Sequence, residues 1–160
     1  MSDYSVKAMK YFKEGYNCAQ SVVAAFCDKL SIDFEIAIKL SSSFGGGMGR
    51  LREVCGAVSG MFIVVGILYG YDNPVNKKAK TEHYKLIQDL AVEFEKQNGS
   101  IICRELLGLG KGADTPVPDD RTKEYYAKRP CVQLVGIAAE IIENLIIKME
   151  VTKNENCSGM

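Results

Sequence analysis

The segment that most restricts the fold of this chain runs from Val54 to Tyr71, eighteen residues without a charged side chain. So much apolar surface has to be covered by other protein or by lipid, because its exposure to water is unfavourable. Eighteen residues only reach the lower edge of what crosses a bilayer, and the neighbouring segments are amphipathic, as helices around a buried one would be. We therefore expect a buried central helix of a bundle, with a membrane span as the alternative.

The rest of the chain also carries helical signals. Asn17, followed three residues later by Gln20, resembles a capping box, and Asp33 can cap the next helix. Proline suits the first helical turn, so Asn73-Pro74 and Pro130 each predict the start of a helix. No run alternates as a strand does. The sequence predicts an all-α fold, a compact bundle of about six to seven helices with a buried, Gly-rich central helix; we expect them over about residues 4–14, 18–30, 34–42, 55–69, 74–98, 100–107 and 130–151.

The chain of 160 residues suits a single domain. We expect this all-α domain to occupy residues 1–151, followed by a polar C-terminal tail over residues 152–160. The glycine run at residues 45–49 and the segment 108–120, which holds three glycines and two prolines, are predicted to interrupt the helices. The sequence assigns no role to the 108–120 loop.

Charge and cysteine content limit the partners and the compartment. Twenty basic residues balance twenty acidic ones, so there is no net positive field for a nucleic acid, and we expect no nucleic-acid partner. Six cysteines in 160 residues are too few for a disulfide-dense secreted scaffold, and the first residues show no apolar signal core. We therefore expect a cytoplasmic protein without a membrane partner. The electron-transfer partner is unknown, and a homo-oligomer is compatible with the sequence.

Four of the six cysteines fall at predicted helix starts: Cys18 after Asn17, Cys55 after the glycine run, Cys103 after Ser100 and Cys131 after Pro130. The positive end of the helix dipole favours an anion there, and the thiolate is the reactive and metal-binding form of cysteine. We expect these four sulfurs to converge at one site. Cys27 lies on the opposite face of the helix that holds Cys18, so we interpret it as core filler, and Cys157 as an incidental thiol of the tail.

The sequence around these cysteines resembles a known family. Cys55-Gly-Ala-Val-Ser-Gly60 matches the motif of the C_GCAxxG_C_C redox-active proteins, and four other stretches fit the family as well: residues 16–20, 44–50, 103–108 and 130–131. The resemblance extends from about residue 4 to 147 and implies that Cys18, Cys55, Cys103 and Cys131 are the family cysteines of a small helical redox protein. It also implies an association with iron–sulfur or multihaem electron-transfer proteins. Cys27 and Cys157 have no counterpart in the family pattern.

Several chemistries fit four such cysteines. A [2Fe–2S] iron–sulfur cluster and a structural zinc ion each take four cysteine ligands. The chain has no C-x-x-C pair, yet a thiol–disulfide pair can also be closed in three dimensions. We expect a redox-active protein that uses electron transfer or thiol–disulfide exchange. The alternatives are a zinc-binding module and a helical protein whose cysteines only pack. The enzyme class stays open.

Other residues are candidates for supporting roles. Gly56 and Gly60 share a helical face and would let a cofactor approach, while Ser59, one turn from Cys55, could donate to its sulfur. The alternative is close helix packing. Arg50 and Arg52 are interpreted as a solvated turn, with charge balance near the thiolates as the alternative.

His83 and the glycine run at residues 45–49 are further candidates for ligand binding. His83 lies on the apolar stripe predicted for the long helix, which favours a hydrogen-bonded core histidine over a ligand. The glycine run at residues 45–49 lacks the spacing of a phosphate-binding loop.

Overall fold

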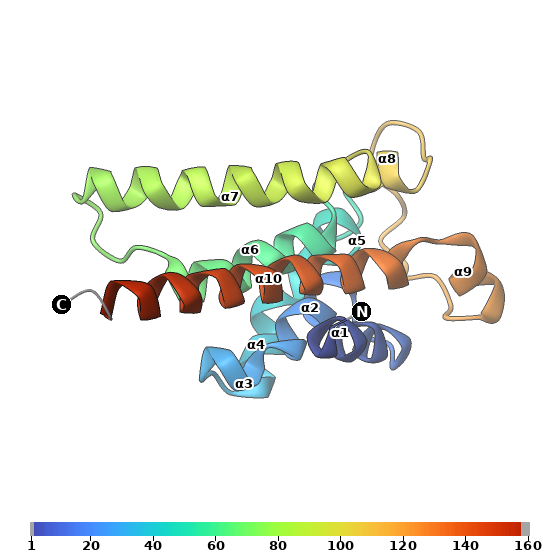
Figure 1. The fold of residues 1–160 in the computed structure, drawn as a ribbon. Helices are drawn as coiled ribbons and strands as arrows, with labels where there is room; N and C mark the ends of the chain where they lie inside the picture. Colours follow the sequence, from blue (N-terminus) through green and yellow to red (C-terminus); the bar gives the residue numbers. More distant parts are fainter. Residues whose placement is uncertain (1, 158–160) are drawn as a thin grey trace.

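Helices make up the fold throughout the described part of the chain, residues 2–157 of a computed structural model (Figure 1). Six of them have eight or more residues, which confirms the predicted all-α bundle. In chain order the elements are α1 (Asp3–Lys13), α2 (Cys18–Ala25), α3 (Cys27–Leu30), α4 (Phe34–Ser41), the 3₁₀ turn η1 (Ser42–Phe44), α5 (Gly45–Met48), α6 (Gly56–Tyr69), α7 (Lys77–Asn98), α8 (Cys103–Leu106), α9 (Lys123–Lys128) and α10 (Cys131–Cys157).

Side-chain caps fix the starts of α1, α2, α4, α7 and α9. The capping box is present at Asn17, whose side chain accepts from the backbone of Gln20 and whose own backbone N–H donates to the Gln20 side chain. Asp33 caps α4 as predicted. The start predicted for α7 at Asn73-Pro74 is wrong, because the Asn73 side chain accepts from Val75 in a turn and Asn76 provides the cap instead.

The single helix predicted over residues 18–30 is divided into α2 and α3. Phe26 leaves the helical conformation with φ −104° and ψ 8°, and its buried ring stacks on Tyr4 with 4.3 Å between ring centroids. Cys27 therefore begins α3 rather than continuing the helix of Cys18.

The central helix is α6. It packs against α2, α7 and α10, and its first two turns are buried, whereas Ile67 near its end is 42% exposed. Gly60 makes the contact with α2 possible, since a Cβ at this position would lie 2.9 Å from the carbonyl oxygen of Ala19. No helix among residues 2–157 is long and apolar enough to cross a membrane.

The two longest helices differ from their predicted extents. α10 continues through residues 152–157, so the last helix does not end near Val151, and residues 158–160 of the predicted tail lie outside the described residues. The apolar stripe predicted for α7 is buried only at Leu90 and Phe94. Val75, which was predicted to begin this stripe, precedes α7 and is exposed. Figure 1 shows α7 alongside α10, with α5, α8 and α9 gathered at the end where α10 begins.

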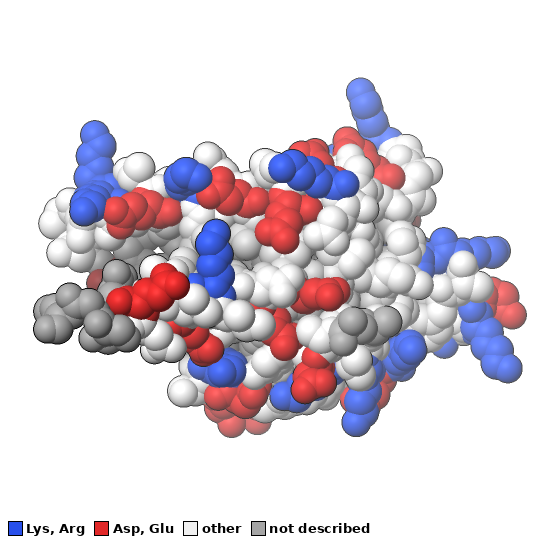
Figure 2. Space-filling view, in the orientation of Figure 1, with Lys and Arg blue, Asp and Glu red and all other residues white. Residues whose placement is uncertain are grey.

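The surface charge is mixed on the face seen in Figure 2. Lys and Arg alternate with Asp and Glu along the upper edge formed by α7, where the pairs Lys78–Glu82 and Lys85–Asp89 lie one helical turn apart. Exposed pairs of this kind contribute little to stability.

Candidate functional site

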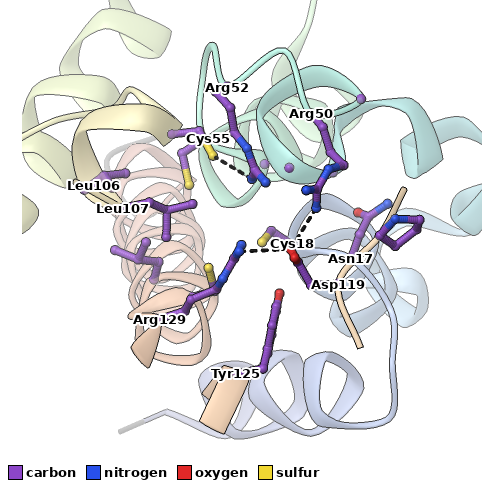
Figure 3. A pocket seen from close by; sticks show the side chains of 18 of the residues that line it. Asn17, Cys18, Arg50, Arg52, Cys55, Leu106, Leu107, Asp119, Tyr125 and Arg129 are labelled. Atoms are coloured by element: carbon purple, nitrogen blue, oxygen red, sulfur yellow. Dashed lines mark hydrogen bonds and ion pairs between the residues drawn. The ribbon is translucent and has the colours of Figure 1, made fainter. Parts of the chain in front are cut away.

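Four helix starts meet around one cavity, and each carries a cysteine. Cys55 is the N-cap of α6, and Cys18, Cys103 and Cys131 are the first residues of α2, α8 and α10. All four line the same cavity of about 270 Å³ (Figure 3). Cys27 does not line it, and its thiol donates to the carbonyl oxygen of Val23 in α2. The side chain of Cys157 lies outside the described residues.

A short antiparallel backbone pairing holds the segments of Cys55 and Cys103 next to each other. Val54 and Ile102 form an isolated β-bridge. On either side of it the Cys55 N–H donates to Ile101 over 2.8 Å and the Cys103 N–H donates to Glu53 over 2.6 Å. Cys55 lies opposite Ile101, which is two positions from Cys103. Because residues two positions apart on an extended segment share a face, the side chains of Cys55 and Cys103 point to the same side. The pairing thus presents both thiols to the cavity.

The glycine run fits closely around these cysteines. Gly47 has φ +67°, a left-handed conformation that glycine adopts at little cost. A Cβ on Gly47 would lie 2.5 Å from the Cβ of Cys103, and one on Gly56 would lie 3.0 Å from the Cβ of Cys18. The glycines at residues 45–49 therefore let the chain turn tightly beside the cysteines.

Arg50 and Arg52 form part of the cavity wall, and their interpretation as a solvated turn is wrong. The Arg52 side chain is only 3% exposed and donates to Asp114 over 2.7 Å and to the sulfur of Cys103 over 3.8 Å. Arg50 is 13% exposed and forms ion pairs with Asp114 and Asp119. The alternative of charge balance near the thiols describes these arginines, because the loop at residues 108–120 folds over them and supplies the carboxylates.

Two further arginines on the cavity wall were missed in the sequence. Arg129 forms an ion pair with Asp119 over 2.9 Å. Arg121 donates to the carbonyl oxygens of Phe12 and Tyr16, both over 3.3 Å. The position of Arg129, two residues before the start of α10, could have identified it, because basic residues near a cysteine at a helix start favour its thiolate. Arg121 precedes α9 and has no such signal in the sequence.

The electrostatics single out Cys131 among the four thiols. A hydrogen bond with Cys18 lowers the pKa of Cys131 to about 7, and the nearby guanidinium groups, Arg129 foremost, act in the same direction against the effect of burial. The same hydrogen bond, together with burial, raises the pKa of Cys18 well above its ordinary value. The pair therefore holds one proton on Cys18 and favours the thiolate on Cys131.

The helix-start argument for the other cysteines is wrong as far as their acidity is concerned. Burial raises the pKa of Cys55 to about 12, despite hydrogen bonds from the backbone of Ala57 and Val58. Burial also raises the pKa of Cys103, which the hydrogen bond from Arg52 only partly offsets. The free energy needed to remove the thiolate from water exceeds the stabilisation that these helix ends give it. Position at a helix start is shared by all four cysteines, whereas a favoured thiolate is not.

The remaining candidates lie away from this cavity or act in packing. Gly56 lines the cavity, but Ser59 and Gly60 do not. The buried Ser59 hydroxyl has no hydrogen-bond partner within residues 2–157, so it does not donate to Cys55. His83 is partly buried, its Nδ1 is without a partner in the described structure, and its ring contacts Tyr71 at a separate cavity. It is therefore neither a hydrogen-bonded core histidine nor part of the cysteine site.

We expect the reactivity of Cys131 toward iodoacetamide to rise to half its maximum near pH 7, because the pKa of this thiol is about 7 and only the thiolate is alkylated. Replacement of Cys18 by Ala removes the hydrogen-bond donor and should shift this midpoint upward. The measurement is residue-resolved mass spectrometry over a pH series. Cys103 in the same cavity serves as the internal control, and a shared midpoint for Cys103 and Cys131 would contradict the assignment.

The cysteine site does not fit a metal centre in this arrangement. A zinc ion needs all its sulfur ligands about 2.3 Å from one point, and a cluster likewise needs several cysteines to converge. Within residues 2–157, no three Cys, His, Asp or Glu side chains are grouped so that they could hold a metal ion. Cys18, Cys55, Cys103 and Cys131 thus share a cavity without sharing a coordination centre.

Comparison with known proteins agrees with this picture of a cysteine site. No curated protein and no solved structure was found to match the chain. A family model described as "Putative redox-active protein (C_GCAxxG_C_C)" matches residues 16–145, a span that includes all four cysteines of the cavity. The resemblance noted in the sequence is confirmed, and the chain belongs to the C_GCAxxG_C_C family.

Proposed function

We propose that this protein carries out thiol–disulfide exchange, with Cys131 as the attacking thiolate and Cys18 as the second thiol. The observation that carries the proposal is that Cys18 and Cys131 lie on the wall of one cavity, where each thiol shifts the pKa of the other. Exchange requires a thiolate and a second thiol within reach of the same sulfur. The pair supplies both.

The reaction balances with an external disulfide as the oxidant. The thiolate of Cys131 attacks one sulfur of the disulfide, which forms a mixed disulfide and releases the other half as a thiolate. Cys18 then loses its proton and attacks the sulfur of Cys131. This step forms the Cys18–Cys131 disulfide and releases the second half of the substrate. The protein loses two electrons and the proton of Cys18, and the two released thiolates become two thiols by taking up this proton and one from water.

The cavity wall supports the first step through charge. Arg129, Arg121 and Arg52 all favour the anionic form of Cys131. Cys131 is also the first residue of the 27-residue helix α10, whose N-terminal amides favour an anion. Cys55 and Cys103, with their raised pKa values, are protonated at neutral pH and are expected to react more slowly.

The proposal is tested by identification of the disulfide that forms. Reduced protein is exposed without air to 2-hydroxyethyl disulfide, blocked with an alkylating agent and digested with trypsin. We expect a disulfide that links the tryptic peptide of residues 14–29, which contains Cys18, to the tryptic peptide that contains Cys131. Cys18 and Cys27 share the first of these peptides, so the Cys27→Ser variant makes the assignment unambiguous. A link only between Cys55 and Cys103, or no link, would contradict the proposal.

The iron–sulfur and zinc hypotheses predict a different outcome for the same protein. A protein purified without air and holding either centre would contain stoichiometric iron and sulfide, or zinc. All four cysteines would then resist alkylation until the metal is removed, because metal-bound thiolates are poor nucleophiles. For the exchange proposal, we expect free Cys131 to be alkylated at neutral pH in the protein as purified.

A further inference from the structure

The wall of the cysteine cavity is strongly biased toward positive charge. Four arginines line it, Arg50, Arg52, Arg121 and Arg129, whereas Asp119 is the one carboxylate among its lining residues. Figure 3 shows Arg50, Arg52 and Arg129 directed toward its interior from different sides. This bias contrasts with the zero net charge of the chain and with the mixed charges of the face in Figure 2.

The charges of these arginines are only partly compensated. Asp114 pairs with both Arg50 and Arg52. Asp119 is shared between Arg50 and Arg129. Two carboxylates thus pair with three of the four guanidinium groups.

Arg121 is the arginine without an acidic partner in the described structure. Its guanidinium group donates to the carbonyl oxygens of Phe12 and Tyr16, and the ring centroids of Phe12 and Tyr125 lie 4.3 and 4.9 Å from its guanidinium carbon. Arg129 shares its carboxylate partner, Asp119, with Arg50. Arg121 and Arg129 therefore offer positive charge to an incoming anion, on the same wall as Cys131.

The dimensions of the cavity indicate a small ligand. Its volume of about 270 Å³ lies just below the range of about 300–1,000 Å³ typical of small-molecule sites. Cys131 is only 7% exposed, so a disulfide on the surface of a folded partner cannot approach its sulfur closely. Apolar side chains complete the wall, among them Leu106, Leu107 and Leu134.

We infer that the cavity takes a low-molecular-weight disulfide whose arms carry carboxylates, with Arg121 and Arg129 binding a carboxylate while the disulfide bond meets Cys131. Guanidinium groups suit this partner because they bind carboxylates through paired, charge-assisted hydrogen bonds. The inference rests on the proposed function and names its substrate class. The disulfide is reduced to two carboxylate-bearing thiols as the Cys18–Cys131 disulfide forms, with electrons and protons balanced as above.

Three small disulfides of similar size and different charge test the inference. They are 3,3′-dithiodipropionate, 2-hydroxyethyl disulfide and cystamine, which are anionic, neutral and cationic. The rate at which each oxidises the reduced protein is divided by its rate with a free small thiol, which removes intrinsic reactivity. We expect the anionic disulfide to be favoured over the neutral one by about tenfold, and the cationic one to be slowest, because like charges repel it.

Substitutions locate the source of this preference. Arg121→Gln and Arg129→Gln should each reduce the ratio of the anionic to the neutral rate several-fold. This ratio is insensitive to the thiolate fraction of Cys131, which affects both disulfides equally. Arg104→Gln is the matched control: Arg104 pairs with Glu53 and does not line the cavity, so the ratio should stay as in the unmodified protein.

The outcomes separate the two proposals. If the Cys18–Cys131 disulfide forms but the three disulfides give equal normalised rates, the substrate class is wrong and the exchange function stands. Faster oxidation by a protein disulfide, with oxidised insulin chains as the probe, would also overturn the small-ligand inference. If no disulfide reacts at Cys131, the proposed function itself fails.

Discussion

Cys131→Ser is expected to slow the reduction of a small disulfide at pH 7 by about tenfold or more. With a pKa of about 7, roughly half of Cys131 is thiolate at this pH, against about one per cent for a thiol of the ordinary value near 9. The lower basicity of the thiolate reduces its intrinsic reactivity and offsets part of that advantage. The serine hydroxyl stays protonated and cannot replace it. The rate is measured from the amount of thiol released in reactions stopped at fixed times.

Cys18→Ser should behave differently from Cys131→Ser. Cys131 can still attack, so one thiol is released, but the reaction stops at the mixed disulfide because no second thiol completes it. Intact mass measurement distinguishes the two variants by the adduct. Cys27→Ser is the control, since Cys27 lies outside the cavity, and it should retain the full reaction. An equal loss of disulfide reduction in the Cys27→Ser and Cys131→Ser variants would show that the cysteines have been grouped wrongly.

Gly60→Ala is expected to lower the free energy of unfolding by about 1–3 kcal/mol, the usual effect of overpacking a filled core. Its Cβ would lie 2.9 Å from the carbonyl oxygen and 3.1 Å from the Cα of Ala19. These are backbone atoms of α2, so relief requires that the two helices move apart. Because α2 begins with Cys18, the same shift should also slow formation of the Cys18–Cys131 disulfide.

Gly66→Ala provides a matched control on the same helix. A Cβ at Gly66 meets nothing within 4 Å, so this substitution should raise the free energy of unfolding by about 0.5–1 kcal/mol through the better helix propensity of alanine. Urea denaturation followed by circular dichroism measures both variants. Similar effects at residues 60 and 66 would show that α2 and α6 are not in close contact.

The features that could be predicted from the sequence are those set by neighbouring residues. The cap at Asn17 depends on Gln20, three positions away, and both hydrogen bonds of the box are present. Cys18 follows this cap at the start of α2. Cys55 and Cys103 lie at the starts of α6 and α8, which have no side-chain cap, and Ser100 does not cap α8 as predicted. The break at Phe26 was missed because the burial of its ring against Tyr4 involves a helix more than twenty residues away.

The chemistry of the cavity depends instead on contacts between distant segments. Arg52 is 62 positions from Asp114 in the chain, and the backbone pairing beside Cys55 and Cys103 joins residues nearly fifty positions apart. Such partners have no signature in local spacing. The interpretation of Arg50 and Arg52 as a solvated turn failed for this reason.

By itself, the sequence determined the all-α fold, the buried central helix and the four cysteines at helix starts, because hydrophobic periodicity and caps act over a few residues. Only the tertiary structure decided which cysteine favours the thiolate. Helix position is equivalent for all four, but acidity depends on burial and on the charges that the fold brings near. Cys131 receives a hydrogen bond from Cys18 and lies near three arginines, whereas burial dominates at Cys55 and Cys103.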